Sequence, residues 1–444
     1  MFTAVIAALG GLLFGYDTGI IASALLFIRQ DFELSSFQQG MVVSAVPVGA
    51  IFGAALSGQL ADRYGRRRMI MLAALLFVVG SVFSALAPDA TVLILARVVI
   101  GFAIGLASAA CPVYISEVAP AHLRGRLVTL FQLAVTVGIL VAYGVGLALE
   151  PSGSWEWMLA LGAIPAILLG VGIAAMPQSP RWLVMIGDSI QARRELLKLR
   201  PDVDGVDEEL HEIEQTISAE KGSWSDLRRP AVRAALVVGV GLAILQQVTG
   251  INTVIYYAPT IIQDTGIDSD SAAILASVGV GVVNVLATVL ALWLVSRFGR
   301  RPLLFVGVTG MVVALIALGL AFEVGSGGEG LASLAVIALM VYVGSFAISL
   351  GPIFWLLNSE IYPLRARGRA AGVGTMANWA SNFAISLTFL PLLNLLGNAP
   401  TFWLYAAVGL FTVWFCVRFV PETKGKQLEE IEEIFEARAA GKAG

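Results

Sequence analysis

Apolar runs of about 20 residues recur twelve times along this chain, and this repetition limits the possible folds more than any other feature. Each run is long enough to cross the hydrocarbon core of a bilayer as one helix. Of the 444 residues, 58% are hydrophobic and 13% are charged, whereas soluble domains carry about 25% charged residues. The sequence therefore predicts an all-α membrane protein with twelve transmembrane helices, over residues 2–28, 38–61, 69–87, 91–116, 127–149, 157–176, 231–262, 271–295, 302–322, 331–357, 370–396 and 401–420.

The distribution of Lys and Arg among the loops predicts how these helices are oriented. Every Lys and Arg except Arg29 and Arg97 falls on one side of the predicted membrane, most densely at residues 63–68, 297–301 and 365–369. Short loops rich in Lys and Arg remain in the cytoplasm. The sequence therefore predicts a multi-pass protein of the cell (inner) membrane with both termini cytoplasmic, and no cleavable leader is expected.

A polar segment separates the first six apolar runs from the last six. Residues 189–200 and 207–221 have helical charge patterns that are too polar to span a membrane, so they should form short cytoplasmic helices. In the final segment, Leu428, Ile431 and Phe435 share one helical face, which predicts a docked helix. The predicted domains are an N-terminal six-helix bundle (1–176), a cytoplasmic linker (177–230), a C-terminal six-helix bundle (231–420) and a cytoplasmic helix and tail (421–444).

Three short motifs of the first half return in the second half at similar spacing. In secondary transporters, parallel repeats of six helices place a substrate site between the two halves. The repeat therefore predicts two pseudo-symmetric bundles and a transport function. The matching pairs are RYGRR at 63–67 with RFGRR at 297–301, Ser116-Glu117 with Ser359-Glu360, and Pro177 with Pro421.

Residue clusters typical of metal sites or catalysis are missing from the sequence. The chain contains two Cys and two His, and Cys111 and Cys416 lie apart in apolar runs, where packed thiols are commoner than a disulfide. The sequence has no Gly-rich phosphate loop and no nucleophile elbow. We therefore expect no enzymatic activity, no catalytic residues, no metal, no cofactor and no nucleic-acid partner.

Two charged residues lie deep within predicted spans. Asp17 falls about two-thirds of the way along the first span, and Arg97 falls within the fourth. At ~1.5 Å per residue both reach a similar depth, so an ion pair is possible. A charge at such depth costs on the order of 2.5–3.5 kcal/mol on insertion scales and is by default a functional hypothesis. We predict that Asp17 and Arg97 couple transport to protons; the alternative is a static pair that fixes two helices.

Amide side chains gather in the seventh span, which contains Gln246, Gln247 and Asn252. Each sugar hydroxyl both donates and accepts hydrogen bonds, and amides can do the same. Gly250 and Pro259 should bend or break this helix and open its backbone towards a cavity. A lone amide in a membrane helix serves about as often in an interhelical hydrogen bond as in ligand binding, so either role is open for each residue.

The whole chain resembles the sugar porter family of the major facilitator superfamily. The resemblance implies twelve helices, alternating access between two bundles and monosaccharide transport. It also implies proton symport, because symporters of the family carry Asp at position 17 whereas the mammalian facilitative glucose transporters carry Asn. The segments that carry it are FGYDTG (14–19), GQLADRYGRRR (58–68), PVYISEVAPAHLRG (112–125), QSPRW (178–182), QQVTGIN (246–252), SRFGRR (296–301), GPIFWLLNSEIYPLRARG (351–368), NWASNF (378–383) and PETKG (421–425).

The resemblance also assigns roles to individual residues. Phe14 is expected to touch the sugar or to plug the outer path, and Tyr256 and Tyr257 are gate or packing candidates. The residues that match the family's sugar site are Gln132, Gln246, Gln247, Asn252, Asn284, Trp355, Asn378 and Trp379. Those that match its cytoplasmic salt-bridge network, here called the latch, are Asp62, Arg63, Arg66, Glu117, Arg124, Arg300, Arg301, Glu360 and Arg367.

Two positions depart from the family pattern. Gln178 stands where the family has Glu in its PESPR motif, and Ser296 stands where the first repeat has the acid Asp62. Each change removes an anionic partner of the Arg clusters. We therefore predict a weakened latch and a resting population biased towards the inward-open state.

The sequence thus predicts a monosaccharide–proton symporter that imports a hexose or pentose such as glucose or xylose. The alternatives are a facilitative uniporter, a polyol transporter and a transporter-like sugar sensor. Small-residue pairs at Gly49 and Gly53 and at Gly101 and Gly105 predict close helix packing within a monomer rather than dimerisation. The expected partners are the sugar, protons and the lipid bilayer.

Overall fold

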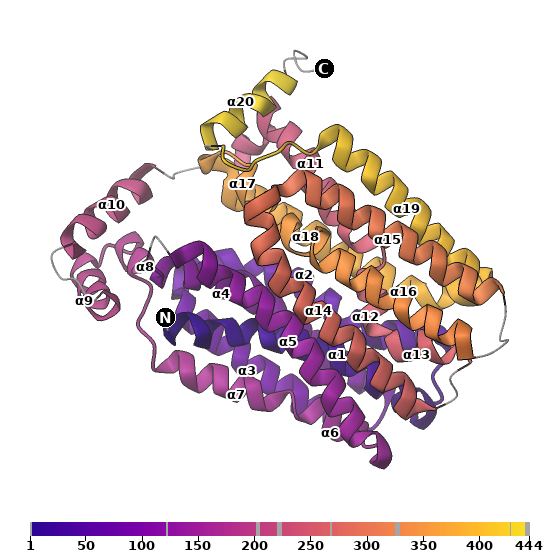
Figure 1. Cartoon of the computed structure of the whole chain (residues 1–444). Helices are drawn as coiled ribbons and strands as arrows, with labels where there is room; N and C mark the ends of the chain where they lie inside the picture. Colours follow the sequence, from indigo (N-terminus) through magenta and orange to yellow (C-terminus); the bar gives the residue numbers. More distant parts are fainter. Residues whose placement is uncertain are drawn as a thin grey trace. The chain divides into compact units, whose positions relative to one another are not determined.

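The structure is a computed structural model and describes residues 2–120, 123–200, 205–219, 224–266, 269–324, 329–426 and 428–439. Within these ranges the ordered elements are helices (Figure 1). The helices before residue 230 are α1 (Phe2–Asp31), α2 (Ser36–Tyr64), α3 (Arg66–Ala85), α4 (Ala90–Val118), α5 (Arg124–Leu149), η2 (Glu150–Ser152), α6 (Trp155–Ala160), α7 (Ala163–Ala174), α8 (Pro180–Met185), α9 (Ser189–Leu199), α10 (Val206–Ala219) and η3 (Trp224–Arg228).

The second half of the chain is built in the same way. Its helices are α11 (Pro230–Val248), α12 (Ile251–Tyr256), α13 (Ala258–Gln263), α14 (Asp270–Phe298), α15 (Arg300–Glu323), α16 (Glu329–Ala347), α17 (Leu350–Glu360), α18 (Leu364–Leu396), α19 (Asn398–Phe419) and α20 (Leu428–Ala439).

Twelve helical segments of the described chain are long and apolar enough to cross a membrane. This result confirms the predicted fold class. Most helices extend beyond the apolar runs. The helix α2, for example, continues through Asp62 and Arg63 to Tyr64, because backbone hydrogen bonding does not stop where the side chains become polar.

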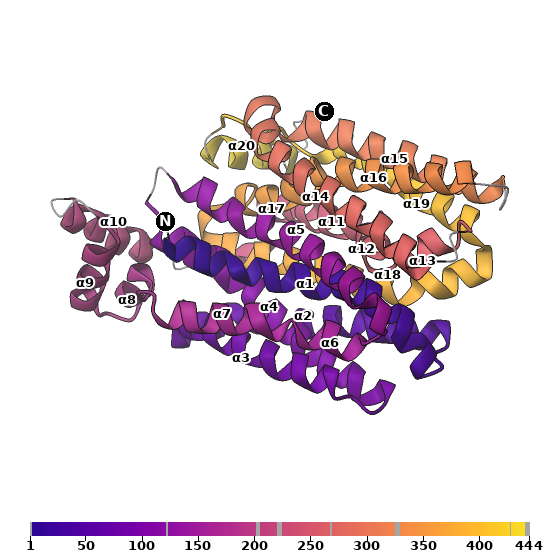
Figure 2. The same ribbon diagram turned by 60° about the horizontal axis from the view of Figure 1, so that its bottom comes forward.

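The chain divides into two compact units, and the helices α1, α2, α5 and α6 contribute to both. The first unit comprises Met1–Tyr16, Ala45–Gly138 and Leu159–Gly222; the second comprises Asp17–Ser44, Ile139–Met158 and Ser223–Gly444. In the first unit α3 packs against α4 and α7, and in the second α15 packs against α16 and α19 (Figure 2). The predicted division into two six-helix bundles at residues 176 and 231 remains a prediction.

Glycines bring α2 and α4 into backbone contact within the first unit. A Cβ on Gly49 would lie 2.6 Å from the backbone nitrogen of Phe102, and one on Gly105 would lie 2.8 Å from that of Ala54. No side chain fits there, because real Cβ contacts do not come that close. The prediction that this spacing serves close packing within one chain is confirmed for these two helices.

The polar linker forms the expected short helices. The helices α8, α9 and α10 lie side by side (Figures 1 and 2) and share a small apolar core of Trp182, Leu183 and Ala192. The helix α20 packs against α11 with Ile431 and Phe435 buried, as the helical spacing predicts. The side chain of Leu428, the third residue of that face, lies outside the described residues.

Candidate functional site

The seventh span is broken into three helices, α11, α12 and α13. Its first break falls at Gly250, whose φ of 96° is a left-handed conformation that side chains disfavour. Its second break falls at Tyr257, two residues before Pro259. The predicted interruption of this helix by Gly250 and Pro259 is therefore confirmed. Both breaks leave backbone groups without helical partners.

The tenth span has a break that the sequence analysis missed, between α16 and α17. The helix restarts at Leu350 after the non-helical Ser349. Pro352 follows closely, and a proline lacks the N–H that would bond to the carbonyl four residues earlier. Gly351-Pro352 was the available signal. The break matters because the carbonyl of Leu350 accepts a hydrogen bond from Gln246 Nε2 at 2.8 Å.

Four of the predicted sugar-site amides meet in one hydrogen-bonded chain, here called the amide network. Asn252 Nδ2 donates to Gln247 Oε1 at 2.6 Å, and Gln247 Nε2 donates to Asn378 Oδ1 at 3.1 Å. Asn378 Nδ2 in turn donates to Gln246 Oε1 at 2.6 Å. The network thus joins α11, α12 and α18 to the broken tenth span. Gln246, Gln247 and Asn378 are each at most 5% exposed, so these amides satisfy one another where lipid or packing would penalise unpaired polar groups.

Tyrosines and one further amide connect the breaks to the surrounding helices. Tyr342 of α16 donates to the carbonyl of Thr249 at 2.7 Å, and Tyr143 of α5 donates to that of Ile255 at 2.8 Å. Tyr257 packs on Phe389, and Asn382 Nδ2 donates to the Tyr256 hydroxyl at 3.3 Å. Buried tyrosines thereby hold the interrupted helix in place.

The other predicted site residues are distributed over both units. In the second unit, Asn284 on α14 and Trp379 on α18 are buried, and Trp355 on α17 is half-buried against Phe354. Asp17, also assigned to that unit, is 4% exposed. The remaining three belong to the first unit: Phe14 and Gln132 are half-buried and Arg97 is 1% exposed. The pairing of Asp17 with Arg97 remains a prediction.

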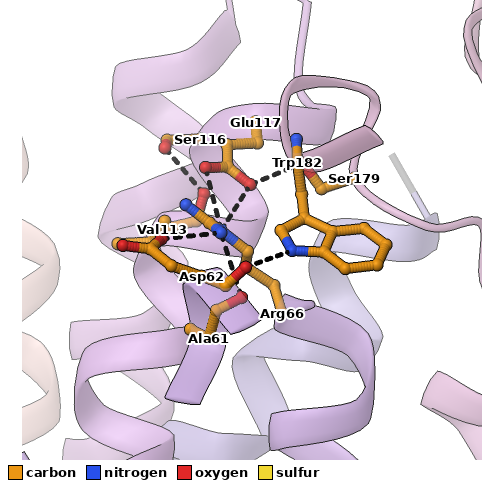
Figure 3. Close-up of polar contacts among 8 residues, drawn as sticks. All are labelled: Ala61, Asp62, Arg66, Val113, Ser116, Glu117, Ser179 and Trp182. Carbon is orange, nitrogen blue, oxygen red and sulfur yellow. Dashed lines mark hydrogen bonds and ion pairs between the residues drawn. The ribbon is translucent and has the colours of Figure 1, made fainter. Parts of the chain in front are cut away.

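Three latch residues of the first unit, Asp62, Arg66 and Glu117, form one ion-pair cluster (Figure 3). Arg66 Nε lies 3.1 Å from Glu117 Oε2, and Arg66 Nη1 lies 3.0 Å from Asp62 Oδ1. Ser179 donates to Glu117 Oε2 at 2.5 Å. The side chains of Arg66 and Glu117 are 11% and 6% exposed, so breaking this pair would leave a charge uncompensated, at a cost of ~3–5 kcal/mol.

The second unit contains a matching cluster built from the second copy of the motifs. Arg300 Nη2 lies 2.6 Å from Glu360 Oε1, and Thr423 donates to Glu360 Oε2 at 2.7 Å. Thr423 thus donates to Glu360 as Ser179 donates to Glu117 in the first cluster. The sequence repeat therefore extends to the contacts of individual side chains. Each of these ion pairs joins residues of a single unit, so a tie between the two bundles remains a prediction.

The two clusters differ at the position after the repeated proline. Glu422 Oε1 accepts from the backbone N–H of Arg300 at 3.0 Å, and its Oε2 accepts from that of Arg301 at 2.9 Å, which caps α15. Burial alone would raise the pKa of Glu422, but backbone N–H donors from Arg300, Lys424 and Arg301 and the Arg300 charge hold it below its usual value. The second unit therefore places an anion at the positive end of a helix.

Gln178 occupies the same place in the first unit without making these bonds. A Cβ on Gly65 would lie 2.9 Å from Gln178 Nε2, just as one on Gly299 would lie 2.9 Å from Glu422 Oε1. Gly65 stands directly before the first turn of α3, as Gly299 stands before that of α15. Gln178 Oε1 is buried and has no hydrogen-bond partner among the described residues. The amide thus fills the space of the carboxylate but leaves α3 uncapped.

Ser296 produces the reciprocal defect in the second unit. Its hydroxyl donates to the carbonyl of Trp293 at 2.7 Å, whereas Asp62, its counterpart, pairs with Arg66. Arg300 Nε is also buried without a hydrogen-bond partner within the described ranges, whereas Arg66 Nε bonds to Glu117 and Asp62 contacts Arg66 Nη1. Each cluster therefore lacks one acid that the other possesses.

The other latch candidates make local contacts. Arg63 lies over the ring of Tyr64, and Arg367 Nε donates to the carbonyl of Tyr362 at 3.2 Å. The Arg301 guanidinium donates to the carbonyl of Val417. The side chain of Arg124 lies outside the described residues.

Restoring the missing acid should stabilise the first cluster. We expect Gln178→Glu to raise the melting temperature of the purified protein by roughly 1–2 °C, because the new carboxylate caps α3 as Glu422 caps α15. Glu422→Gln is the matched control and should lower it by a similar amount. An unchanged melting temperature in Gln178→Glu beside a lowered one in Glu422→Gln would contradict this account of the cap.

Comparison with known proteins places the chain in a family. The model of the family described as "Sugar (and other) transporter" matches residues 3–435, nearly the whole chain. The chain belongs to this sugar transporter family. The predicted resemblance is therefore confirmed, and membership in a family of transporters agrees with the expectation that the chain is not an enzyme.

Individual members of the sugar transporter family match along almost their entire length. The D-xylose transporter of Levilactobacillus brevis is 42% identical over 433 residues, which cover 97% of this chain and 94% of that protein. The galactose-proton symporter of Escherichia coli K12 is 42% identical over 432 residues, with 97% and 93% covered. A partially occluded inward-open structure of the xylose transporter XylE from E. coli matches with a TM-score of 0.85 at 34% identity, over 96% of this chain and 99% of that one.

Proposed function

We propose that this protein imports a monosaccharide by proton symport through alternating access. The observation that carries the proposal is the amide network, in which amides from α11, α12 and α18 meet beside two helix breaks. Amides that bond to one another can exchange those bonds for bonds to sugar hydroxyls, since each group both donates and accepts. The relatives named as xylose and galactose transporters support the same substrate class.

The sugar site consists, in this proposal, of the amide network together with Gln132, Asn284, Trp355 and Trp379. Indole rings present flat apolar faces, which fit the C–H face of a pyranose. Phe14 would close the site from one side, and Tyr256 and Tyr257 would act as gates. Buried tyrosine contacts at the helix breaks support a gating role, because they must be remade when the helix moves.

Proton coupling rests on Asp17 and Arg97. Both side chains are buried in membrane-spanning helices. In such surroundings the protonation of a carboxyl depends on the charges and the solvent around it. We infer that protonation of Asp17 releases Arg97 and favours the loaded transition. A facilitative uniporter is the second candidate; it shares every feature except the need for the acid at position 17.

The clusters around Arg66 and Arg300 would act as the cytoplasmic latch. The concentration of Lys and Arg at these helix ends supports a cytoplasmic location for both termini. We propose that the protein lies in the inner membrane as a monomer. Since each cluster lacks one acid, the latch should hold weakly and bias the resting protein towards the inward-open state. Cysteine labelling from the cytoplasmic side should fall in the double variant Gln178→Glu, Ser296→Asp; unchanged labelling would exclude this bias.

Uptake of labelled sugars by proteoliposomes tests the function directly. With an inward proton gradient we expect xylose, glucose or galactose to accumulate above the outside concentration, and a protonophore should abolish the excess. Equilibration of the sugar that does not depend on the proton gradient would identify a uniporter. Uptake of inositol in place of all three sugars would identify a polyol transporter, and binding without uptake would point to a sensor.

A further inference from the structure

Three arginines gather at the last turn of α19. The Arg301 guanidinium, from the start of α15, donates to the carbonyl of Val417, and Arg438 Nη1, from α20, donates to that of Phe419 at 2.5 Å. Arg418 lies between these two carbonyl positions in the sequence and covers the ring of Phe419, 5.6 Å from its centroid. Residues far apart in the chain thus place three positive charges around one helix end.

Helix capping accounts for only part of this charge. A helix C-terminus carries the equivalent of about −0.5 elementary charge, against three full positive charges here. Within the described residues none of the three arginines forms an ion pair. Burial lowers the pKa of Arg438, and Arg418 and Arg301 lower it further. The cluster therefore repels itself and has an excess of positive charge that an anion would neutralise.

The surface next to the cluster is apolar and lies at membrane level. The helix α19 is one of the twelve candidate membrane spans. Leu410, Trp414 and Val417 are 58%, 53% and 46% exposed, and their spacing of four and three residues puts them on one face. That face ends at Arg418. Tryptophan is enriched where hydrocarbon meets headgroups, and Trp414 stands one turn before the arginine.

We propose that this end of α19 binds an anionic phospholipid, with the phosphate on Arg418, Arg301 and Arg438 and an acyl chain along Leu410, Trp414 and Val417. Guanidinium groups bind phosphate oxygens through paired, charge-assisted hydrogen bonds. The apolar face favours a lipid over a free phosphate, because a soluble anion would make no contact with that face. The site is independent of the sugar site.

The bound lipid would also hold α20 in place. The helix α20 is attached through buried Ile431 and Phe435 and through Arg438, whose charge is repelled by its two neighbours. Neutralising Arg418 and Arg301 removes that repulsion. Anionic lipid therefore stabilises the docked position of α20 (Figure 1) against α11.

The test is a lipid titration of the full-length protein in detergent, read as its melting temperature. We expect dioleoylphosphatidylglycerol to raise the melting temperature in a saturable way, and dioleoylphosphatidylcholine to have a much smaller effect. Arg418→Gln should raise the half-saturating concentration of phosphatidylglycerol roughly fivefold, and adding Arg438→Gln should raise it further. Arg297→Gln is the matched control, because Arg297 also lies exposed over an aromatic ring, that of Trp293, and it should leave the titration unchanged.

Several results would overturn the proposal. The same shift with inorganic phosphate or glycerol 3-phosphate would assign the cluster to a soluble anion. An unchanged phosphatidylglycerol titration in Arg418→Gln would show that the lipid does not bind at this end of α19. Should the double variant fail to fold, Arg418→Gln alone decides, since its exposed side chain leaves no cavity. As a second measurement, dibrominated phosphatidylglycerol should quench tryptophan fluorescence less in Trp414→Phe; equal quenching would place the lipid elsewhere.

Discussion

Asp17→Asn should abolish sugar accumulation in proteoliposomes, so that the inside concentration rises only to the outside value whatever the proton gradient. Asn retains the shape of the side chain and one acceptor oxygen but cannot take up a proton. Exchange of labelled for unlabelled sugar should continue, because exchange does not require the return of the empty carrier. The matching measurement is substrate-dependent alkalinisation of the outer medium, which should vanish.

Asp31→Asn provides a control for this prediction on the same helix. Asp31 ends α1 at the exposed surface and accepts a hydrogen bond from Trp155 Nε1 at 2.6 Å, and an Asn oxygen can still accept it. We expect this variant to accumulate sugar normally. Accumulation and alkalinisation that persist in Asp17→Asn would reduce Asp17 to a structural role and move proton coupling elsewhere.

Asn378→Ala should weaken sugar binding by roughly 10- to 100-fold. The change removes an amide that would pair with a sugar hydroxyl in the proposed site, and a buried polar group left unpaired in the complex costs about 1–3 kcal/mol. Gln246 Oε1 and Gln247 Nε2 lose Asn378 as a partner but still bond to each other at 3.3 Å. The loss should be visible in the dissociation constant of the purified protein, measured by quenching of tryptophan fluorescence or by calorimetry.

Asn358→Ala is the comparison that separates a site effect from a folding effect. Asn358 is another buried amide of the same unit, and its Nδ2 donates to the carbonyl of Ala371 at 3.1 Å. Both variants lose a buried amide, so both should melt earlier than the parent protein, while only Asn378→Ala should lose affinity. Equal affinity in the two variants would exclude Asn378 from the sugar site.

Local sequence signals predicted most of the architecture. The apolar runs predicted twelve spans because the length of a membrane helix is set by bilayer thickness. Gly250 predicted the break of the seventh span, since a left-handed residue cannot continue a helix. The break before Leu350 was missed, because Pro352 is also compatible with a kinked but continuous helix. Whether such a helix bends or stops depends on which groups bond to its backbone near the break, here Gln246 Nε2, which donates to the carbonyl of Leu350.

The partners of individual side chains were less predictable than their presence. The sequence placed Gln246, Gln247, Asn252 and Asn378 at the candidate site. Amides are interchangeable as donors and acceptors, however, so no spacing rule specifies that Asn378 bridges the two glutamines. The unpaired Arg300 Nε likewise follows no spacing rule, because it depends on which nitrogen of Arg300 faces Glu360. Such a defect became interpretable only when the two repeats could be compared contact by contact.

The closed amide network also has a consequence for the speed of transport. In the proposed sugar site, each bond from an amide to a sugar hydroxyl would replace an amide–amide bond and add few to the total. Binding would then exchange amide–amide bonds for amide–hydroxyl bonds of similar strength. The geometry of the site would set the selectivity, and the net free energy of binding would be small. A carrier must release its sugar as readily as it binds it. Amides that bond to one another again when the sugar dissociates lower the free-energy barrier to release.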